Sequence, residues 1–119
     1  MNTSLTIDVI ERRRREILAQ MEQIRRLCRG TLNTLYKPQI KQGISTGNQN
    51  GPYYVLSRNV NGKTKSRNVP ARELDVVREG LEQHALFSKL CDEYEELTQR
   101  LGELERNEQA ASEWQKKGH

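Results

Sequence analysis

Residues 51–70 read GPYYVLSRNVNGKTKSRNVP and contain the clearest structural signal in the chain. Two runs rich in strand-forming residues, 53–60 and 63–69, flank Asn61-Gly62, a pair that tolerates the positive φ angles of a two-residue hairpin turn. Pro70 ends the second run, because proline cannot donate a hydrogen bond to a strand ladder. The stretch therefore predicts a β-hairpin.

The register of this hairpin follows by counting outward from the turn. Arg58 is predicted to face Lys65, a like-charge pair that costs stability, and a three-residue turn would shift the register by one. Alternation then divides the side chains between two faces. One face carries Tyr54, Leu56, Arg58, Val60, Lys63, Lys65, Arg67 and Val69, and the other carries Tyr53, Val55, Ser57, Asn59, Thr64, Ser66 and Asn68.

The basic residues of the hairpin belong to a longer block without a carboxylate. The chain has 20 Lys+Arg and 16 Asp+Glu, but residues 23–72 contain ten bases and no acid, whereas residues 92–108 contain seven acids and two bases. A block of one sign raises self-repulsion unless an anionic partner relieves it, so the pattern favours a polyanion as partner. The alternative is a solvated basic face that only aids solubility.

The segments on either side of the block are helical in pattern. Between residues 4 and 29 apolar side chains recur at heptad spacing: Ile7, Ile10, Ile17, Met21, Ile24 and Cys28. Arg14 is at the one polar position of this seam, where it must extend to solvent or pair with an acid. Residues 71–112 predict a long helix with two apolar stripes, and a bend, a change of partner or local overwinding is expected between residues 80 and 88. The first stripe of this helix is Leu74, Val77 and Leu81, which we expect to pack under the hairpin. The second stripe is a heptad seam of Phe87, Leu90, Tyr94, Leu97, Leu101 and Leu104. The seam of the first helix includes Ile10, Ile17, Met21 and Ile24.

These two seams are natural partners, because each is too narrow to stand alone in water and their flanking charges are opposite in sign. The predicted fold is α+β and mostly α: two long helices pair as a coiled coil and present a central β-hairpin. The pairing forms either within one chain or between the chains of a homodimer, and the small core favours the dimer. The expected segments are a basic helix at 1–30, a basic loop and hairpin at 31–70, a long helix at 71–112 and a frayed tail at 113–119. Within the second segment, residues 31–38 are expected to be a connector and 39–51 a polar loop.

Several classes of protein are excluded by what the sequence lacks. No apolar run approaches the length of a membrane-spanning helix, and the N-terminus does not resemble a signal peptide, so a cytoplasmic protein with reduced cysteines is expected. Two cysteines and two histidines do not suit a four-ligand zinc site. The sequence contains no phosphate-binding glycine loop, nucleophile elbow or HExxH motif, so neither an enzyme nor a cofactor is expected.

Nucleic acid is the polyanion that the residues favour. We expect Arg58, Lys63, Lys65 and Arg67 to contact phosphates, with support from Lys37, Lys41, Arg25 and Arg29. Tyr53 and Tyr54 are adjacent in a strand and point to opposite faces, so one is core and the other could stack on a base or hydrogen-bond a phosphate. The alternative is a strand pair whose lysines only guard its edge against aggregation.

The motifs of this region also resemble a family of small prokaryotic proteins of uncharacterised function, found among transposases and other mobile-element genes. The resemblance spans residues 23–98 and rests on RLCRGTL (26–32), GPYYVLSR (51–58), NGKTKSR (61–67), Val69-Pro70 and a helix with Val77-Arg78-Glu79. It implies a prokaryotic or phage origin and a partner tied to DNA. Members often carry clustered cysteines before Gly-Pro-Tyr, but this chain has KQGISTG (41–47) there, so no metal-bound loop is expected. In shape alone, the hairpin looks like the small β-sheet arm-binding domains of tyrosine recombinases.

The sequence therefore predicts a non-enzymatic, sequence-tolerant DNA-binding protein, with an accessory or regulatory role in a mobile element or phage. One alternative is a coiled-coil interaction module, an adaptor or inhibitor whose basic block meets an acidic protein. The other is an RNA-binding protein in which Tyr53 or Tyr54 stacks on an unpaired base.

Overall fold

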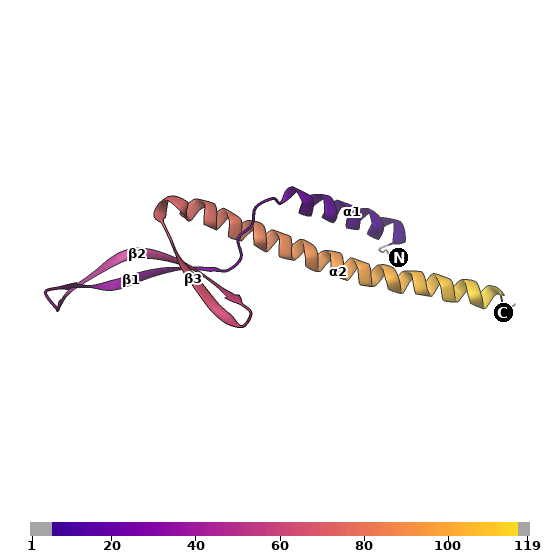
Figure 1. Ribbon diagram of the computed structural model, residues 1–119. Helices are drawn as coiled ribbons and strands as arrows, with labels where there is room; N and C mark the ends of the chain where they lie inside the picture. The colour runs from indigo at the N-terminus through magenta and orange to yellow at the C-terminus, as the bar shows by residue number, and fades with distance from the viewer. Residues whose placement is uncertain (1–5, 117–119) are drawn as a thin grey trace. The chain divides into compact units, whose positions relative to one another are not determined.

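A computed structural model describes residues 6–116 of the chain. The elements in order are α1 (Ile7–Gln23), β1 (Thr31–Lys41), β2 (Ile44–Val60), β3 (Lys63–Val69), the 3₁₀ turn η1 (Ala71–Glu73) and α2 (Leu74–Lys116) (Figure 1). The helices α1 and α2 hold 17 and 43 residues, about half of the chain. The predicted α+β class is therefore confirmed.

The chain divides into two compact units, which are described separately. The sheet unit consists of residues 26–84, and the helical unit combines the chain up to Arg25 with the part from Ala85 onward. The helix α2 contributes to both units without interruption. Of the changes expected between residues 80 and 88, the structure shows a change of packing partner along α2. The boundary between the two units lies between His84 and Ala85.

The sheet unit contains an antiparallel sheet in the order β1-β2-β3. The predicted register of the β2–β3 hairpin is confirmed from Val60 opposite Lys63 to Tyr54 opposite Val69. Asn61 and Gly62 have φ angles of 53° and 82°, as a two-residue turn of this type requires. The strand β3 ends at Val69, directly before Pro70.

The prediction of a connector and a polar loop over residues 31–51 is wrong, because this segment forms a second hairpin from β1 and the first half of β2. Its turn is Gln42-Gly43, where both residues also have positive φ angles. Gly51 has a φ of 134°, and a Cβ atom there would lie 3.0 Å from the Leu35 carbonyl oxygen. Register shifts between Leu35 and Lys37 and between Pro38 and Ile40 interrupt the ladder, so the alternation that reveals a strand is lost.

The core of the sheet unit is a small apolar cluster on one face of the sheet. Leu56, Val69 and Val77 are 6%, 4% and 5% exposed. This confirms that the first stripe of the long helix packs under the hairpin. The partly buried side chains around the cluster are Cys28, Leu32, Tyr54 and Leu81.

The first helix ends earlier than its heptad pattern predicts. It stops at Gln23, and Ile24 already has an extended backbone, so Ile24 and Cys28 do not continue the helical seam. Cys28 instead packs against the cluster of the sheet unit, and its N–H donates to the Gly80 carbonyl at 2.8 Å. The sheet unit therefore contains Cys28, a residue that the heptad spacing assigns to the helix.

In the helical unit, α1 runs antiparallel to the second half of α2. Arg13 donates two hydrogen bonds to the Glu93 carboxylate, at 2.7 and 2.9 Å, and Thr6 and Ile7 share a hollow with Leu104 and Asn107. The predicted seam residues that are buried are Ile10, Ile17, Leu90 and Leu101, and those that are half-buried are Met21, Phe87, Tyr94, Leu97 and Leu104.

Arg14 occupies the polar position of the seam and needs no acid there. Its guanidinium donates to the Tyr94 hydroxyl at 3.0 Å and to the Thr98 hydroxyl at 3.1 Å. The guanidinium carbon also lies 4.9 Å from the centre of the Tyr94 ring, a cation–π contact. At its far end, α2 continues through Trp114 to Lys116 instead of fraying from residue 113; residues 117–119 lie outside the described part of the chain.

The close approach of Cys28, in the segment between α1 and β1, to α2 predicts opposite results for two substitutions on this helix. A Cβ at Gly80 would lie 2.7 Å from the Cys28 Cβ, so we expect Gly80→Ala to lower the free energy of unfolding by about 1–3 kcal/mol. A Cβ at Gly102 would meet only the flexible Arg106 guanidinium, at 3.4 Å. Gly102→Ala should therefore raise the free energy of unfolding by up to about 1 kcal/mol. Urea unfolding followed by circular dichroism measures both. A stabilised Gly80→Ala variant would contradict the contact.

Candidate nucleic-acid interface

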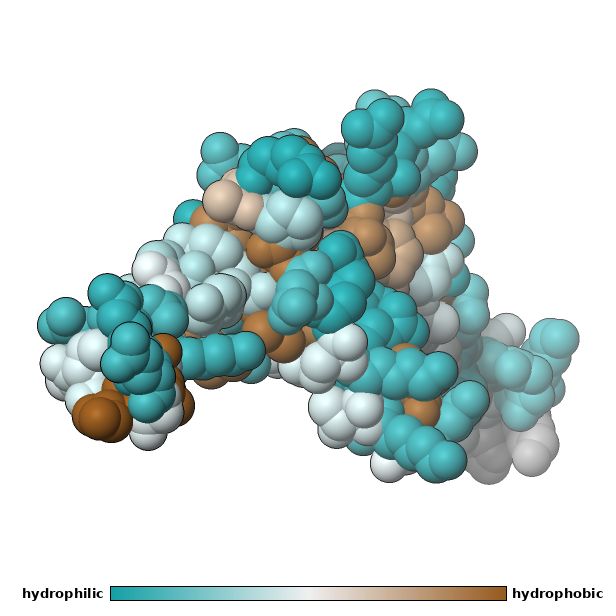
Figure 2. All heavy atoms as spheres, turned by 60° about the vertical axis from the view of Figure 1, so that its left-hand side comes forward, coloured by the Kyte–Doolittle hydropathy of each residue, from teal (hydrophilic) through white to brown (hydrophobic). Residues whose placement is uncertain are grey.

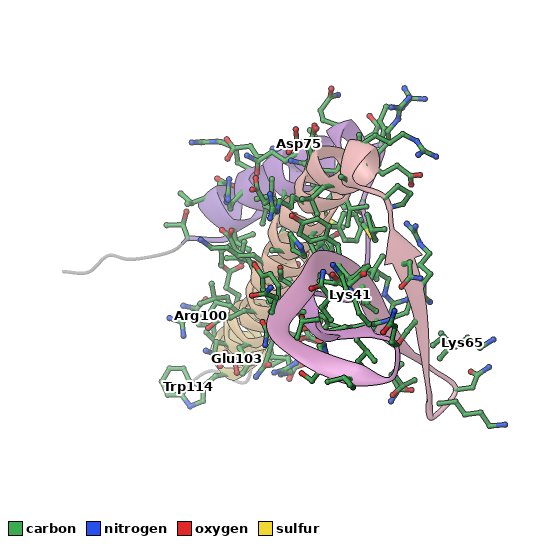
Figure 3. The ribbon with its side chains drawn as sticks, turned by 90° about the vertical axis from the view of Figure 1, so that its left-hand side faces the viewer. Lys41, Lys65, Asp75, Arg100, Glu103 and Trp114 are labelled. Atoms are coloured by element: carbon green, nitrogen blue, oxygen red, sulfur yellow. The ribbon has the colours of Figure 1, made fainter. Side chains whose placement is uncertain are left out.

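The end of the β2–β3 hairpin carries a cluster of cations that the register brings together. Arg58 lies directly opposite Lys65, and Lys63 and Arg67 lie two residues to either side of Lys65 on the same face. All four residues are exposed. We call these four residues the hairpin cations. In Figure 3 the Lys65 side chain extends outward from its strand into solvent.

Three of the hairpin cations border a hollow on the sheet surface. The hollow has a volume of about 270 Å³, and it is lined by Leu56, Arg58, Val60, Lys65, Ser66 and Arg67. Its floor is apolar and its rim is cationic. Such a concave surface suits a phosphate group, because several guanidinium and ammonium donors can converge on it.

The hairpin cations have little internal compensation for their charge. Arg67 lies 3.9 Å from the Glu73 carboxylate, an exposed and weak ion pair. Within residues 6–116, the side chains of Arg58, Lys63 and Lys65 make no ion pair. The like-charge pair between Arg58 and Lys65 therefore remains unrelieved unless an anion binds from outside.

The opposite face of the sheet is polar and uncharged near the same hairpin. The Ser57 and Ser66 hydroxyls lie 2.8 Å apart in a hydrogen bond, and the Asn59 side chain accepts from the Gly62 N–H at 2.9 Å. Tyr53 belongs to this face and is 41% exposed, whereas Tyr54 packs against the core cluster. The division of the two tyrosines between core and surface thus follows the alternation predicted from the sequence.

The structure distributes the other predicted cations over several places. Lys37 lies on β1 with its ammonium 5.0 Å from the centre of the Tyr53 ring, and Lys41 lies beside the turn of the β1–β2 hairpin (Figure 3). Arg29 is exposed on the connector before β1. Arg25 belongs to the helical unit, so the surface defined on the sheet unit does not include it.

Sequence reasoning missed the second hairpin and therefore the two isoleucines beside its turn. Ile40 and Ile44 are 62% and 71% exposed. The available signal was their position on either side of Gln42-Gly43 in an otherwise polar stretch. Glutamine seldom marks such a turn, so this signal is much weaker than Asn61-Gly62.

Across residues 6–116, no three His, Cys, Asp or Glu side chains gather closely enough to hold a metal ion. The same range contains no helix with both the length and the apolar character needed to cross a membrane. Cys28 and Cys91 are both free thiols.

Comparison with known families adds one finding. Residues 7–79 match the family model described as a domain of unknown function, DUF6788. The chain belongs to the DUF6788 family. No curated protein and no solved structure matches it. The DUF6788 match covers α1, all three strands and the start of α2, so every predicted nucleic-acid residue lies within it. The description of DUF6788 does not concern transposases, so the link to mobile elements stays a prediction.

The unrelieved repulsion between Arg58 and Lys65 predicts that removing one charge stabilises the fold. We expect Lys65→Gln to raise the free energy of unfolding by up to about 1 kcal/mol at low salt. The gain should disappear near 0.5–1 M salt, where the screening length falls to roughly 3–4 Å. Urea unfolding at both salt concentrations measures this, with Arg72→Gln as a control of equal charge on the exposed surface of η1. A loss of stability, or a gain independent of salt, would contradict the prediction.

Proposed function

We propose that this protein is a non-enzymatic DNA-binding protein that contacts the phosphate backbone through the hairpin cations. The single observation that supports the proposal most strongly is the like-charge pair of Arg58 and Lys65, which lies at the rim of a hollow and has no carboxylate partner among residues 6–116. Such an arrangement is unfavourable in the free protein and favourable against a polyanion. Ten bases and no acid over residues 23–72 extend the same preference beyond the hairpin.

The geometry of β3 suits a row of phosphates better than a single anion. Lys63, Lys65 and Arg67 alternate with uncharged residues, so their side chains leave the same face about 7 Å apart. Long, flexible side chains on such a row can reach successive phosphates without reading a base. We therefore propose that the binding tolerates different DNA sequences.

The biological setting is also a proposal. The resemblance to families found among transposases supports an accessory or regulatory role in a mobile element or phage, within the cytoplasm of a prokaryotic cell.

RNA is the second candidate partner, and one observation favours it. The Tyr53 ring is partly exposed beside the Lys37 ammonium, and an exposed aromatic ring next to a cation can stack on an unpaired base. Competition between duplex DNA and single-stranded RNA for the protein separates the two candidates. The adaptor alternative predicts no retention on DNA above about 0.1–0.2 M salt.

We further propose that α1 and the second half of α2 pair as a short antiparallel coiled coil that sets the oligomer or binds a protein partner. The support comes from the buried side chains of Ile10 and Ile17 and from the paired hydrogen bonds of Arg13 to Glu93. These hydrogen bonds hold the pKa of the Glu93 carboxyl below its ordinary value.

The lowered pKa of Glu93 gives the helix pairing a pH dependence. A carboxyl with a lowered folded pKa contributes stability above its unfolded pKa of about 4.3, and this contribution is lost as the pH falls through the folded value. Below about pH 4.3, we expect the stability of the native protein to fall more steeply with decreasing pH than the stability of the Glu93→Gln variant. The exposed Glu95→Gln on the same helix is the control and should keep the native slope. Thermal unfolding between pH 3 and 6 measures this; equal slopes for all three proteins would contradict the pairing.

The proposed DNA contact is tested by removing three of the hairpin cations. We expect Arg58→Ala, Lys63→Ala and Lys65→Ala together to weaken binding at least about tenfold near 0.1 M salt, by similar factors on unrelated duplexes. The slope of log K against log salt should become shallower by roughly 2–3 units, because each phosphate contact contributes about 0.9. Mobility-shift titrations over a range of salt concentrations measure both quantities.

The matched control for this test removes the same charge from the other unit. This control variant combines Lys89→Ala, Arg100→Ala and Arg106→Ala, all on α2 within the helical unit. It should leave the affinity for DNA nearly unchanged. Equal losses in the two triple variants would show that only net charge matters. An unchanged affinity in the hairpin variant would refute the site.

A further inference from the structure

The far end of the β1–β2 hairpin exposes apolar side chains where a turn is usually polar. Ile40 and Ile44 lie on either side of Gln42-Gly43, at 62% and 71% exposure. Ile40 pairs with Ser45 and Ile44 with Lys41, so each face of the hairpin end carries one isoleucine. Figure 2 shows exposed apolar atoms at the end of this lobe, at the left of the view, among hydrophilic ones.

Between the core cluster and the Gln42-Gly43 turn, the β1–β2 hairpin has polar side-chain contacts within itself. The Gln39 amide donates to Asn50 at 3.3 Å and accepts from the Thr46 hydroxyl at 2.8 Å. None of the apolar side chains of the core cluster comes from residues 33–53. The segment is thus a projecting ribbon, built without a core, that carries exposed isoleucines at its end.

The charge of this ribbon restricts its partner. Lys37 and Lys41 flank the isoleucine end, and the whole strand pair carries no carboxylate. An apolar pocket on an average protein surface would not require such a one-sided charge, whereas duplex DNA does. Apolar side chains flanked by cations are also what proteins that bind the minor groove insert between base steps.

We propose that the β1–β2 hairpin inserts Ile40 and Ile44 into the minor groove of duplex DNA, where an isoleucine side chain wedges between base pairs and bends the duplex. Apolar wedges of this kind partly unstack a base step and kink the helix axis. The cations Lys37 and Lys41 contact the phosphates that border the groove. This inference rests on the proposed DNA binding and adds a structural outcome to it: the protein acts as a DNA-bending factor.

Ring closure of a short duplex tests the proposal without knowledge of a binding sequence. A duplex of about 100 bp is shorter than the persistence length of about 150 bp, so ligase closes it slowly unless a bound protein bends it. We expect the native protein to raise the closure rate by roughly tenfold or more. Ile40→Ser and Ile44→Ser together should abolish the acceleration and change the affinity in mobility shifts by only a few fold.

A matched control is Val76→Ser, which removes an apolar side chain of 68% exposure on α2 in the same unit. This variant should accelerate ring closure as the native protein does. Thermal unfolding of all variants shows whether the exposed substitutions leave the fold intact.

The outcomes separate this inference from the proposed function. Binding without acceleration of ring closure would overturn the wedge and leave the DNA contact of the hairpin cations standing. Acceleration that survives the double isoleucine variant would also overturn the wedge. If the native protein does not bind DNA at all, both proposals fail. Binding of the native protein to a second copy of itself through this end, lost in the double variant, would assign the isoleucines to self-association instead.

Discussion

The sheet unit depends on one small apolar contact, between Leu56 and Val69 of the sheet and Val77 of α2. Burying a side chain of this kind contributes about 1.5–3 kcal/mol, so three of them supply a stabilisation comparable to the net stability of a small domain. The segment between α1 and β1 completes this contact: Cys28 approaches Gly80 so closely that a Cβ atom at Gly80 would lie 2.7 Å from the Cys28 Cβ. The contact lies at the start of β1, at the end of β3 and in the part of β2 between the two hairpin turns. The two hairpin ends therefore carry no share of the core and are open to other roles.

Neither hairpin end has a composition that stabilises the fold. One collects cations around Arg58 and Lys65, and the other exposes Ile40 and Ile44 to solvent. Neither feature is needed by the core. The like-charge pair costs stability in the free protein, and the exposed isoleucines gain nothing until a partner buries them. Duplex DNA would offset the first cost with its phosphates and supply the missing burial with its stacked bases. The two proposals therefore share one physical reason, although separate residues carry them.

The sequence predicted the fold best where a local signal and the tertiary structure agree. Asn61-Gly62 allowed the whole β2–β3 register to be counted correctly, and the spacing of Leu74, Val77 and Leu81 identified the packed face of α2. The β1–β2 hairpin was missed because Gln42 is an unusual turn residue and bulges break the alternation. The end of α1 was placed too late because Cys28 satisfies the heptad spacing but packs into the sheet unit. The hairpin cations were found from charge alone, whereas the isoleucine end required the structure.

We propose that DNA docks on the sheet unit, at the two hairpin ends. This is tested by titrating the isotope-labelled native protein with a short duplex and recording NMR spectra of the backbone amides. We expect amide shifts to change around residues 37–46 and 57–67, and to change little along α1 and the second half of α2. Shift changes confined to the helical unit, or spectra that do not respond to the duplex at low salt, would contradict it.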